Sequence, residues 1–321
     1  MTDYIKRFGN SLSFPASGQS WVILSDIEKR IKDKIEKIGK PLKDWDINIY
    51  RGILTGCNEA FIIDKTKRDE LVAKDKKSAE IIRPILRGRD IARYQANFAD
   101  LYLLFIPWHF PLHLDTTITG ASKKAEKVFK EEYPAIYGHL SEYKNILSAR
   151  NIAETGIRYE WYALQRWGAN YWDDFSKQKI AWARLMRISK NDINDFPRFS
   201  LIPKEYYVVD SLCFFTGVDL LYLQGILNSE FAIYYFFNNI AILDDGGMQM
   251  RQQFVELMPI PYVNKEKKQI ISELVKILNK NNDNKIQNDL NKIVYTIYNF
   301  DQKEILQIKQ FIQEKMTIIK E

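Results

Sequence analysis

Arginine side chains recur at short intervals in one part of the chain, at Arg83, Arg87, Arg89 and Arg93. The planar guanidinium matches the spacing of phosphate oxygens and of the guanine edge, and it can donate two parallel hydrogen bonds to either. Asp90 is the one acidic residue within this span. Ion pairing with Glu80 and Asp90, together with packing of the aliphatic stems, is the alternative use of these side chains. We expect contacts to a phosphate-bearing polyanion from three of them: Arg87, Arg89 and Arg93.

A second stretch, residues 158–187, interleaves aromatic rings with arginines and amides. Four of the seven tryptophans fall within it. Rings that alternate with guanidinium groups can stack on nucleobases and donate hydrogen bonds to them. Tryptophan and tyrosine are also core residues, so we expect most of these rings to pack inside. The polar residues expected to face the polyanion are Arg158, Gln165, Arg166, Arg184 and Arg187.

The third candidate is the segment that follows Asp245, where Gly246 and Gly247 are adjacent. Paired glycines allow backbone conformations that other residues avoid. Glutamine and arginine are the side chains that read adenine and guanine edges. An ordinary connector before the next helix is the alternative. We expect contacts from Gln249, Arg251 and Gln252.

Other chemistries lack a motif. Glu266-Lys267-Lys268 has the Glu-x-Lys form of some nucleases, but it begins an expected surface helix, where charges are usual. His109 and His113 are four residues apart, yet Pro111 between them breaks the helix that would align two metal ligands. The chain has three histidines, and no serine–histidine–aspartate order can be assigned. We therefore expect no catalytic and no metal-binding residues.

Longer blocks of sequence carry a family resemblance. Four of them occur in order, at Tyr50–Asp64, Lys77–Tyr94, Leu223–Ser229 and Leu257–Pro261. Together they resemble the TaqI-like C-terminal specificity domain, the target-recognition module of adenine-specific DNA methyltransferases and of fused type IIG restriction–modification enzymes. Upstream, Ile35–Asp46 resembles the segment that joins the methyltransferase to this module, and Ile293–Phe300 resembles the family's C-terminal helical segment.

The resemblance implies that the chain binds double-stranded DNA, reads a short sequence through a groove, and presents an adenine for flipping into a methyltransferase active site. It also adds Arg51, Thr55 and Asn58, from the first block, to the expected DNA contacts. Which DNA sequence is read does not follow from residue types.

The family's catalytic motif is absent from this chain. No Asn/Asp-Pro-Pro-Tyr/Phe tetrapeptide occurs, and no glycine-rich loop suits a nucleoside cofactor. We expect no activity from this chain alone, with S-adenosylmethionine and Mg²⁺ needed only by the parent enzyme. The chain would then be the last third of a longer enzyme or a free-standing specificity fragment. Its partners would be double-stranded DNA and a methyltransferase/endonuclease domain or subunit.

Composition is compatible with this reading without requiring it. Hydrophobic residues make up 46% and charged residues 27%, and the formal charge is +6, which permits a polyanionic partner. Two cysteines are too few for a disulfide framework. Met1–Arg7 lacks the apolar core of a signal peptide. Polar residues interrupt the most apolar stretch, Leu220–Phe237, so we expect a buried helix, no membrane partner and a cytoplasmic location.

The elements that must position these residues follow from periodicity. Ser25 is a candidate N-cap for a helix that carries isoleucines at helical spacing and stops at Gly39 and Pro41. Between residues 46 and 110, short apolar runs alternate with turn signals and predict strands. These strands include 60–63 and 101–106, with a shorter helix near 78–86. Residues 121–147 are expected to be helical.

Further along, 179–183 is a candidate central strand, and 206–209 and 213–216 look like a second strand pair. After the helix at 220–237, three amphipathic helices are expected at 265–280, about 286–298 and 302–319. The predicted fold class is α+β, a mixed β-sheet target-recognition domain with surrounding helices and a C-terminal helical extension. We predict a leader and linker helix in 1–45, the recognition domain in 46–262 and the helical tail in 263–321.

A second hypothesis is a protein-interaction module that docks on a methyltransferase subunit through the isoleucine-striped tail, 270–319. Packing of that stripe on its own domain is the alternative. A third hypothesis, an independent nuclease or methyltransferase, has no motif in its favour.

Overall fold

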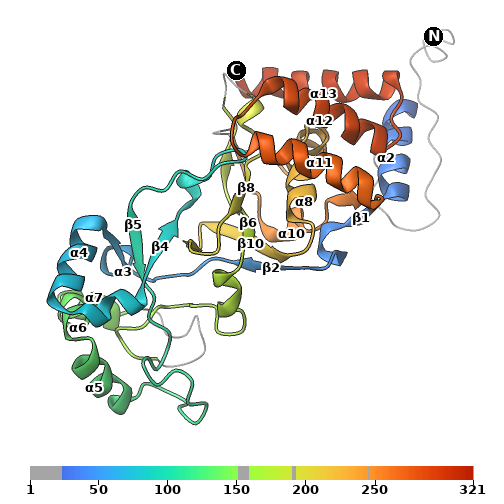
Figure 1. The fold of residues 1–321 in the computed structure, drawn as a ribbon. Coiled ribbons are helices and arrows are strands. Elements are labelled where there is room, and N and C mark those ends of the chain that lie inside the picture. The colour runs from blue at the N-terminus through green and yellow to red at the C-terminus, as the bar shows by residue number, and fades with distance from the viewer. Residues whose placement is uncertain (1–23, 151–158, 190–192, 245, 321) are drawn as a thin grey trace, which may run out of the picture.

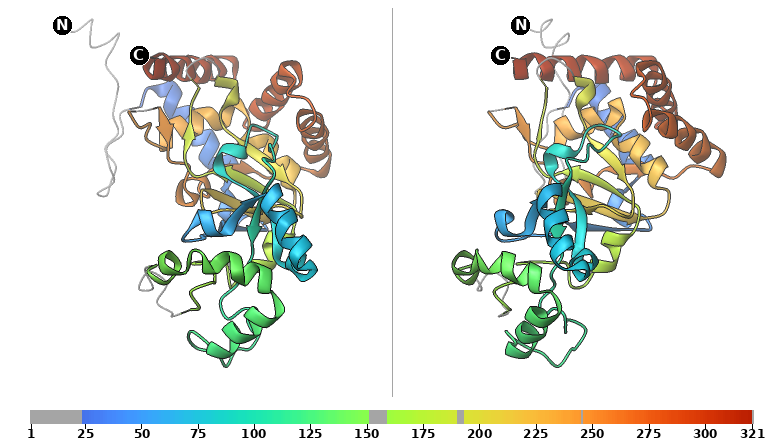
Figure 2. Two further views of the ribbon diagram at one scale, coloured as in Figure 1. Left: turned by 90° about the vertical axis from the view of Figure 1, so that its left-hand side faces the viewer. Right: turned by 60° about the vertical axis from the view of Figure 1, so that its left-hand side comes forward.

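Two four-stranded sheets organise the chain in a computed structural model that describes residues 24–150, 159–189, 193–244 and 246–320. They lie in two lobes that remain distinct from several sides (Figures 1 and 2). The larger lobe holds the main sheet, which is antiparallel throughout and has the order β2-β10-β6-β8. Its strands are β2 (Ile47–Arg51), β6 (Lys179–Ala183), β8 (Phe199–Ile202) and β10 (Leu212–Gly217).

The second sheet connects the smaller lobe to the larger one. Its order is β3-β5-β4-β9, and β4 pairs antiparallel with β5 but parallel with β9. These strands are β3 (Ile62–Asp64), β4 (Ile82–Leu86), β5 (Leu101–Leu104) and β9 (Tyr207–Val208). The helices of the smaller lobe are α3 (Asn58–Phe61), α4 (Lys65–Lys74), α5 (Lys123–Glu132), α6 (Pro134–Ser141) and α7 (Lys144–Ser148).

Helices cover the main sheet on the side away from the smaller lobe (Figure 1). They are α2 (Asp26–Ile38), α8 (Leu220–Leu227), α9 (Glu230–Asn239), α11 (Lys265–Leu278), α12 (Asn284–Ile297) and α13 (Gln302–Lys320). Close packing of α8 against α11 requires a glycine, because a Cβ at Gly225 would lie 2.7 Å from Cγ2 of Ile271 and 2.9 Å from Cγ2 of Val275.

Shorter elements complete the architecture. Two small sheets each pair distant segments: β1 (Gly39–Pro41) with β12 (Pro259–Pro261), and β7 (Met186–Arg187) with β11 (Gly247–Met248). The remaining elements are the helix α10 (Gln252–Val255) and the 3-10 turns at Leu42–Asp44, Lys76–Ile81, Gly88–Asp90, Trp172–Ser176 and Ile193–Asp195.

Much of the predicted architecture is confirmed, including the mixed sheets, the surrounding helices and the C-terminal helical extension. Ser25 caps α2 through a reciprocal pair of hydrogen bonds with Glu28. β6 is an interior strand, and all of its residues are buried. The predicted strand at 101–106 is β5, and the three tail helices are α11, α12 and α13.

Two predictions in the smaller lobe are wrong. The expected helix at 78–86 is a 3-10 turn followed by β4, in which Pro84 lacks the N–H that a helix interior needs. The expected strand at 60–63 is divided, since Ala60 and Phe61 end the helix α3 and only the following residues form β3. Both apolar runs are too short for periodicity to separate a strand from a helix.

Two further corrections concern the larger lobe. The strands at 206–209 and 213–216 do not pair with each other, because β9 joins β4 in the second sheet while β10 lies between β2 and β6. The single helix expected at 220–237 is two helices. Asn228 is the C-cap of the first, and Ser229 caps the second by accepting a hydrogen bond from the Ala232 amide at 3.2 Å.

The predicted domain boundaries stay a prediction. The tail helices pack on the rest of the larger lobe, α11 on α8 and α13 on both α9 and α2. Ile271, Val275, Leu290 and Val294 from the tail's apolar stripe are fully buried there. This part of the stripe is therefore used within the chain, while Ile270, Ile277 and Ile318 stay exposed. No helix of the described segments is long and apolar enough to cross a membrane.

Arg150 connects three segments of the smaller lobe. Its guanidinium donates to the carbonyls of Leu147 (3.0 Å), Thr55 (2.9 Å) and Trp161 (2.5 Å). No carboxylate pairs with it among the described residues. Burial lowers the pKa of this guanidinium, but arginine stays protonated in proteins. The charged group therefore acts as a three-way donor that joins the start of α3 to the segment carrying Gln165 and Arg166.

We predict that Arg150→Ala lowers the free energy of unfolding by about 2–4 kcal/mol, because three carbonyls lose a charged donor. Urea denaturation followed by circular dichroism would measure the loss. Arg89→Ala is the control, since Arg89 is exposed and has no hydrogen-bond or ion-pair partner among the described residues. Equal midpoints for both variants would contradict the assigned role of Arg150.

Candidate nucleic-acid interface

Three of the predicted DNA-contacting arginines converge on one carboxylate, that of Asp210. Nη2 of Arg51 lies 3.0 Å from one carboxylate oxygen, and Nη1 of Arg184 lies 2.9 Å from the other. Nη2 of Arg166 lies 3.6 Å from the first oxygen. All four side chains are partly exposed, with Asp210 at 21% and the arginines between 28% and 38%. Three positive charges and one negative charge thus share a solvent-accessible position.

The main sheet brings two of these arginines together. β10 runs antiparallel to both neighbours, so its first residues lie beside the last residues of β2 and β6. Arg51 ends β2, Arg184 follows β6, and Asp210 precedes β10. The Asp210 amide also donates to the Ile53 carbonyl at 2.8 Å, and Nη1 of Arg184 donates to the Asp210 carbonyl at 3.0 Å.

Arg166 arrives from the segment before the 3-10 turn at Trp172–Ser176. Its backbone exchanges two 3.0 Å hydrogen bonds with Leu54, just after β2. Position 52, between Arg51 and Leu54, requires a glycine, because a Cβ there would lie 2.1 Å from the carbonyl oxygen of Val209. The close approach of Gly52 to Val209 sets the distance between Arg51 and Asp210.

A hollow of about 350 Å³ opens beside the cluster. Its lining residues are Arg51, Arg184, Cys213, Arg251, Gln252, Gln253 and Glu256. Burial raises the pKa of the Cys213 thiol to about 11 although Arg184 lies near it, so the thiol is neutral at pH 7. Glu256 accepts a 3.1 Å hydrogen bond from the Gln252 amide. Arg251 is exposed, and its side chain has no partner among the described residues.

The hollow has an excess of positive charge. With Arg166 included, four guanidinium groups face two carboxylates, those of Asp210 and Glu256, which leaves a formal charge of +2. Guanidinium groups and side-chain amides are the donors that bind phosphate and read base edges. The geometry therefore suits an anionic partner that also presents hydrogen-bonding edges.

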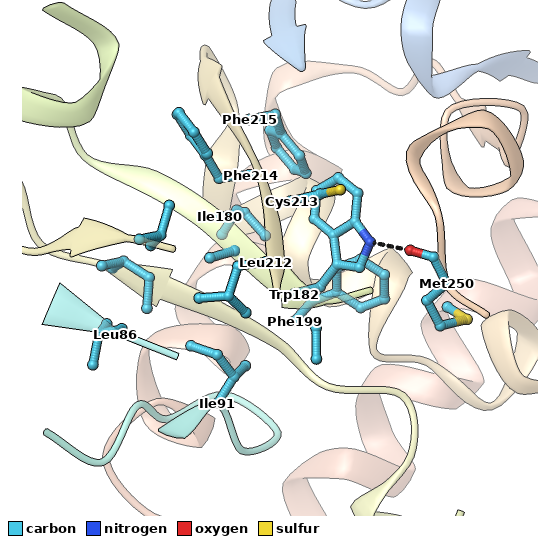
Figure 3. Close-up of a cluster of buried hydrophobic side chains, with 14 of the residues drawn as sticks. Leu86, Ile91, Ile180, Trp182, Phe199, Leu212, Cys213, Phe214, Phe215 and Met250 are labelled. Atoms are coloured by element: carbon cyan, nitrogen blue, oxygen red, sulfur yellow. Dashed lines mark hydrogen bonds between the residues drawn. The ribbon is translucent and has the colours of Figure 1, made fainter. Parts of the chain in front are cut away.

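Trp182 fixes the segment that supplies Arg251 and Gln252. From the interior strand β6, its indole Nε1 donates to the Met250 carbonyl at 2.8 Å (Figure 3). The indole is fully buried and packs against Phe199 and Phe215. The backbone between Gln249 and Gln252 is thus tied to the centre of the main sheet.

The segment at Gly246 and Gly247 pairs with the residues that follow β6 and Arg184. In the pair β7–β11, Gly247 lies opposite Arg187 and Met248 opposite Met186. The Ile188 amide donates to the Gly246 carbonyl at 3.1 Å. The Gly-Gly segment therefore lies beside the segment that follows β6. Arg187 is exposed there, and Gln249 is half-buried.

The first group of predicted arginines, Arg87, Arg89 and Arg93, does not form a single exposed surface. Arg87 donates to both carboxylate oxygens of Asp90, at 3.0 and 2.9 Å, and these hydrogen bonds raise its pKa. Arg89 is exposed. Arg93 is 5% exposed and donates to the Asn228 carbonyl. In this conformation Arg93 is a core residue and does not face solvent, which corrects its expected placement.

The remaining predicted contacts divide in the same way. Thr55 is 2% exposed and donates to Oδ1 of Asn58 at 2.7 Å, while Asn58 itself is exposed. Gln165 is 7% exposed. Thr55 and Gln165 therefore lie inside, contrary to expectation. They pack around the turn at Gly56, where the Thr55 hydroxyl accepts from the Cys57 amide. Arg158 lies outside the described residues.

Two of the residues considered for other chemistries, His109 and Lys268, have structural partners. Glu160 is buried and accepts from the His109 amide at 2.7 Å and from the Ser122 amide at 2.9 Å, and it lies 2.9 Å from Nδ1 of His109. Lys268, in the first turns of α11, pairs with Asp219. Among the described residues no group of three or more histidine, cysteine or acidic side chains could hold a metal ion.

Sequence reasoning missed Asp210 entirely. It is a lone acidic residue between two strands, with no motif around it. A weak signal was available, because a charged residue directly after the apolar run Tyr206–Val209 must lie at a strand end, where the arginines also lie. Its partners could not be found that way, since Arg51 is 159 residues away in sequence.

Comparisons with known proteins agree with this architecture. Residues 83–261 match the TaqI-like C-terminal specificity domain, which is more than half of the chain, so the chain belongs to this family of specificity domains. The predicted resemblance is confirmed. A search of curated proteins found no matching relative.

Two solved structures share the fold. The type IIG restriction endonuclease BpuSI gives a TM-score of 0.55 at 15% identity, over 91% of this chain and 32% of that chain. The type IIL restriction–modification enzyme MmeI, whose structure was determined in complex with DNA, gives 0.53 at 13% identity, over 87% and 36%. The chain therefore spans about a third of each of these enzymes.

We predict that Trp182→Phe is more destabilising than Trp45→Phe by about 1–3 kcal/mol. Both indoles are buried, but Nε1 of Trp45 has no hydrogen-bond partner among the described residues, whereas loss of the Trp182 donor leaves the Met250 carbonyl unpaired. Urea unfolding of the two variants would measure the difference. Equal losses of stability would mean that the Trp182 hydrogen bond contributes nothing.

Proposed function

We propose that this chain binds double-stranded DNA and reads a short target sequence, as the specificity domain of a restriction–modification N6-adenine methyltransferase/endonuclease. The observation that carries the proposal is the convergence of Arg51, Arg166 and Arg184 on Asp210, beside a hollow that also holds Arg251 and Gln252. Membership of the specificity-domain family and the fold shared with DNA-bound MmeI support it.

The two tasks of such a domain fall to different side chains of the cluster. Guanidinium groups with uncompensated charge attract phosphates, and release of counterions makes that attraction depend on salt. Gln249 and Gln252 are of the type that pairs with the adenine edge in the major groove, and Arg251 beside them would contact the phosphate backbone. Arg89, exposed on the turn after β4, would add a phosphate contact.

The chemistry belongs to other parts of the parent enzyme. This chain would present one adenine for flipping, while a methyltransferase/endonuclease domain or subunit would carry out the reaction. We assign S-adenosylmethionine and Mg²⁺ to those catalytic parts. A cytoplasmic location follows from DNA as the partner.

Selection of bound duplexes from a random DNA pool tests the proposal directly. The full chain is expected to enrich one short motif, and the enriched duplex is expected to bind more tightly than a scrambled duplex of the same composition. Absence of any enrichment, together with equal affinity for both duplexes, would reject sequence-specific recognition.

We predict that Arg251→Ala weakens duplex binding and reduces the slope of log K against log[salt] by about 1, as expected for the loss of one phosphate contact. Fluorescence anisotropy across a sodium chloride series would measure both quantities. Lys292→Ala is the control, because it removes the same charge from an exposed position on α12. If the two variants show equal slopes, Arg251 does not touch the backbone.

A further inference from the structure

We propose that Asp210 is a positioning residue that sets the sequence discrimination of DNA binding, by holding three arginine forks in fixed directions. This inference rests on the proposed function. A carboxylate within a DNA-binding surface lowers its positive charge, so on charge alone Asp210 should oppose binding. The contacts of Asp210 indicate that it orients the arginine side chains instead.

Backbone hydrogen bonds hold the turn that carries Asp210. Its amide donates to the Ile53 carbonyl at 2.8 Å, and the Leu212 amide donates to the Val209 carbonyl at 2.8 Å across the turn. The carbonyl of Asp210 accepts from Arg184 at 3.0 Å. Because backbone bonds fix the residue on both sides, the carboxylate has a defined position at the end of the main sheet.

Each arginine uses one terminal nitrogen on this residue and leaves the other terminal nitrogen without a partner among the described residues. Arg51 donates a hydrogen bond to the carboxylate through Nη2 and Arg184 through Nη1, while Nη2 of Arg166 forms an ion pair at 3.6 Å without a hydrogen bond. The carboxylate therefore occupies only one side of each fork, and the other side remains able to donate to a ligand.

Fixed direction matters because arginine is long and flexible. Ordering a free arginine on binding costs conformational entropy, and three like charges without a counterion repel and move apart. A phosphate tolerates many approaches of a guanidinium, whereas a guanine edge accepts two hydrogen bonds only in one geometry. Orientation by Asp210 thus favours base discrimination more than backbone affinity.

The inference predicts opposite effects on two affinities. Asp210→Asn adds one unit of positive charge to the surface and loosens the forks. We expect binding to a scrambled duplex to stay equal or become tighter, with a steeper dependence on salt. Binding to the selected duplex should weaken by about 10-fold, which is within the range that one bidentate base contact contributes. The ratio of the two affinities should therefore fall.

The experiment uses the full chain and two duplexes, one selected from the random pool and one scrambled, across a salt series. Asp210→Glu restores the charge with a longer reach, so it should return the scrambled-duplex affinity to the wild-type value and recover part of the ratio. Asp289→Asn is the control: it loses the same charge from an ion pair with a single partner, Lys292, on α12. Circular dichroism and thermal melting would check folding, and Asp210→Glu serves as the test if the asparagine variant does not fold.

The possible results separate the two proposals. If the wild-type chain does not distinguish the duplexes, the proposed function fails and Asp210 has no discrimination to set. If the wild type discriminates but Asp210→Asn changes both affinities by the same factor, the inference is overturned and the proposed function stands. A new preference for a different base at one position would also overturn it, because Asp210 would then read that base itself.

Discussion

The pairing of β10 with both β2 and β6 is the constraint on which the candidate interface depends. Antiparallel neighbours bring the start of β10 to the ends of the other two strands, and residues far apart in sequence meet there. Leu212 and Phe214 pack on one face of β10 and Phe215 on the other, and all three are fully buried in close packing that fits this register (Figure 3). A slip of one residue would exchange the two faces, place rings where smaller side chains pack, and separate Arg51 from Asp210.

Arginine serves three different purposes in this chain, and its surroundings decide which. Arg87 completes a turn through a one-to-one pair with Asp90. Arg150 joins backbone carbonyls of the smaller lobe. The cluster at Asp210 differs from both, because three guanidinium groups share one carboxylate and stay in contact with solvent. An anion can compete for such incompletely neutralised groups, whereas fully satisfied ones have nothing to gain from it.

Sequence reasoning found the elements whose determinants are local. Ser25 and the isoleucines after it specify α2, and the amphipathic tail specifies its own helices. It failed where distant strands decide the structure. Ile82–Leu86 becomes a strand because β5 and β9 flank it, and β9 is more than 100 residues away.

The candidate site could likewise be predicted only where its determinants are local. Residue type identified Arg51, Arg166 and Arg184 as able to bind anions, but it could not separate them from Arg93, which the fold buries. Exposure depends on which helices cover a strand, and that is a property of the whole chain. Asp210 escaped notice because its importance comes only from the arginines that three other segments bring to it.

The helical tail supports the strands that carry the arginine cluster. α11 packs on α8, and α8 packs on β6 and β8, so the tail supports the main sheet from behind (Figures 1 and 2). Ends of buried strands move little compared with free loops, because many contacts must break together. A surface that distinguishes base edges needs donors held to a fraction of an ångström. The helical layer therefore holds in place the strand ends that carry the arginine cluster, although none of its described residues belongs to that cluster.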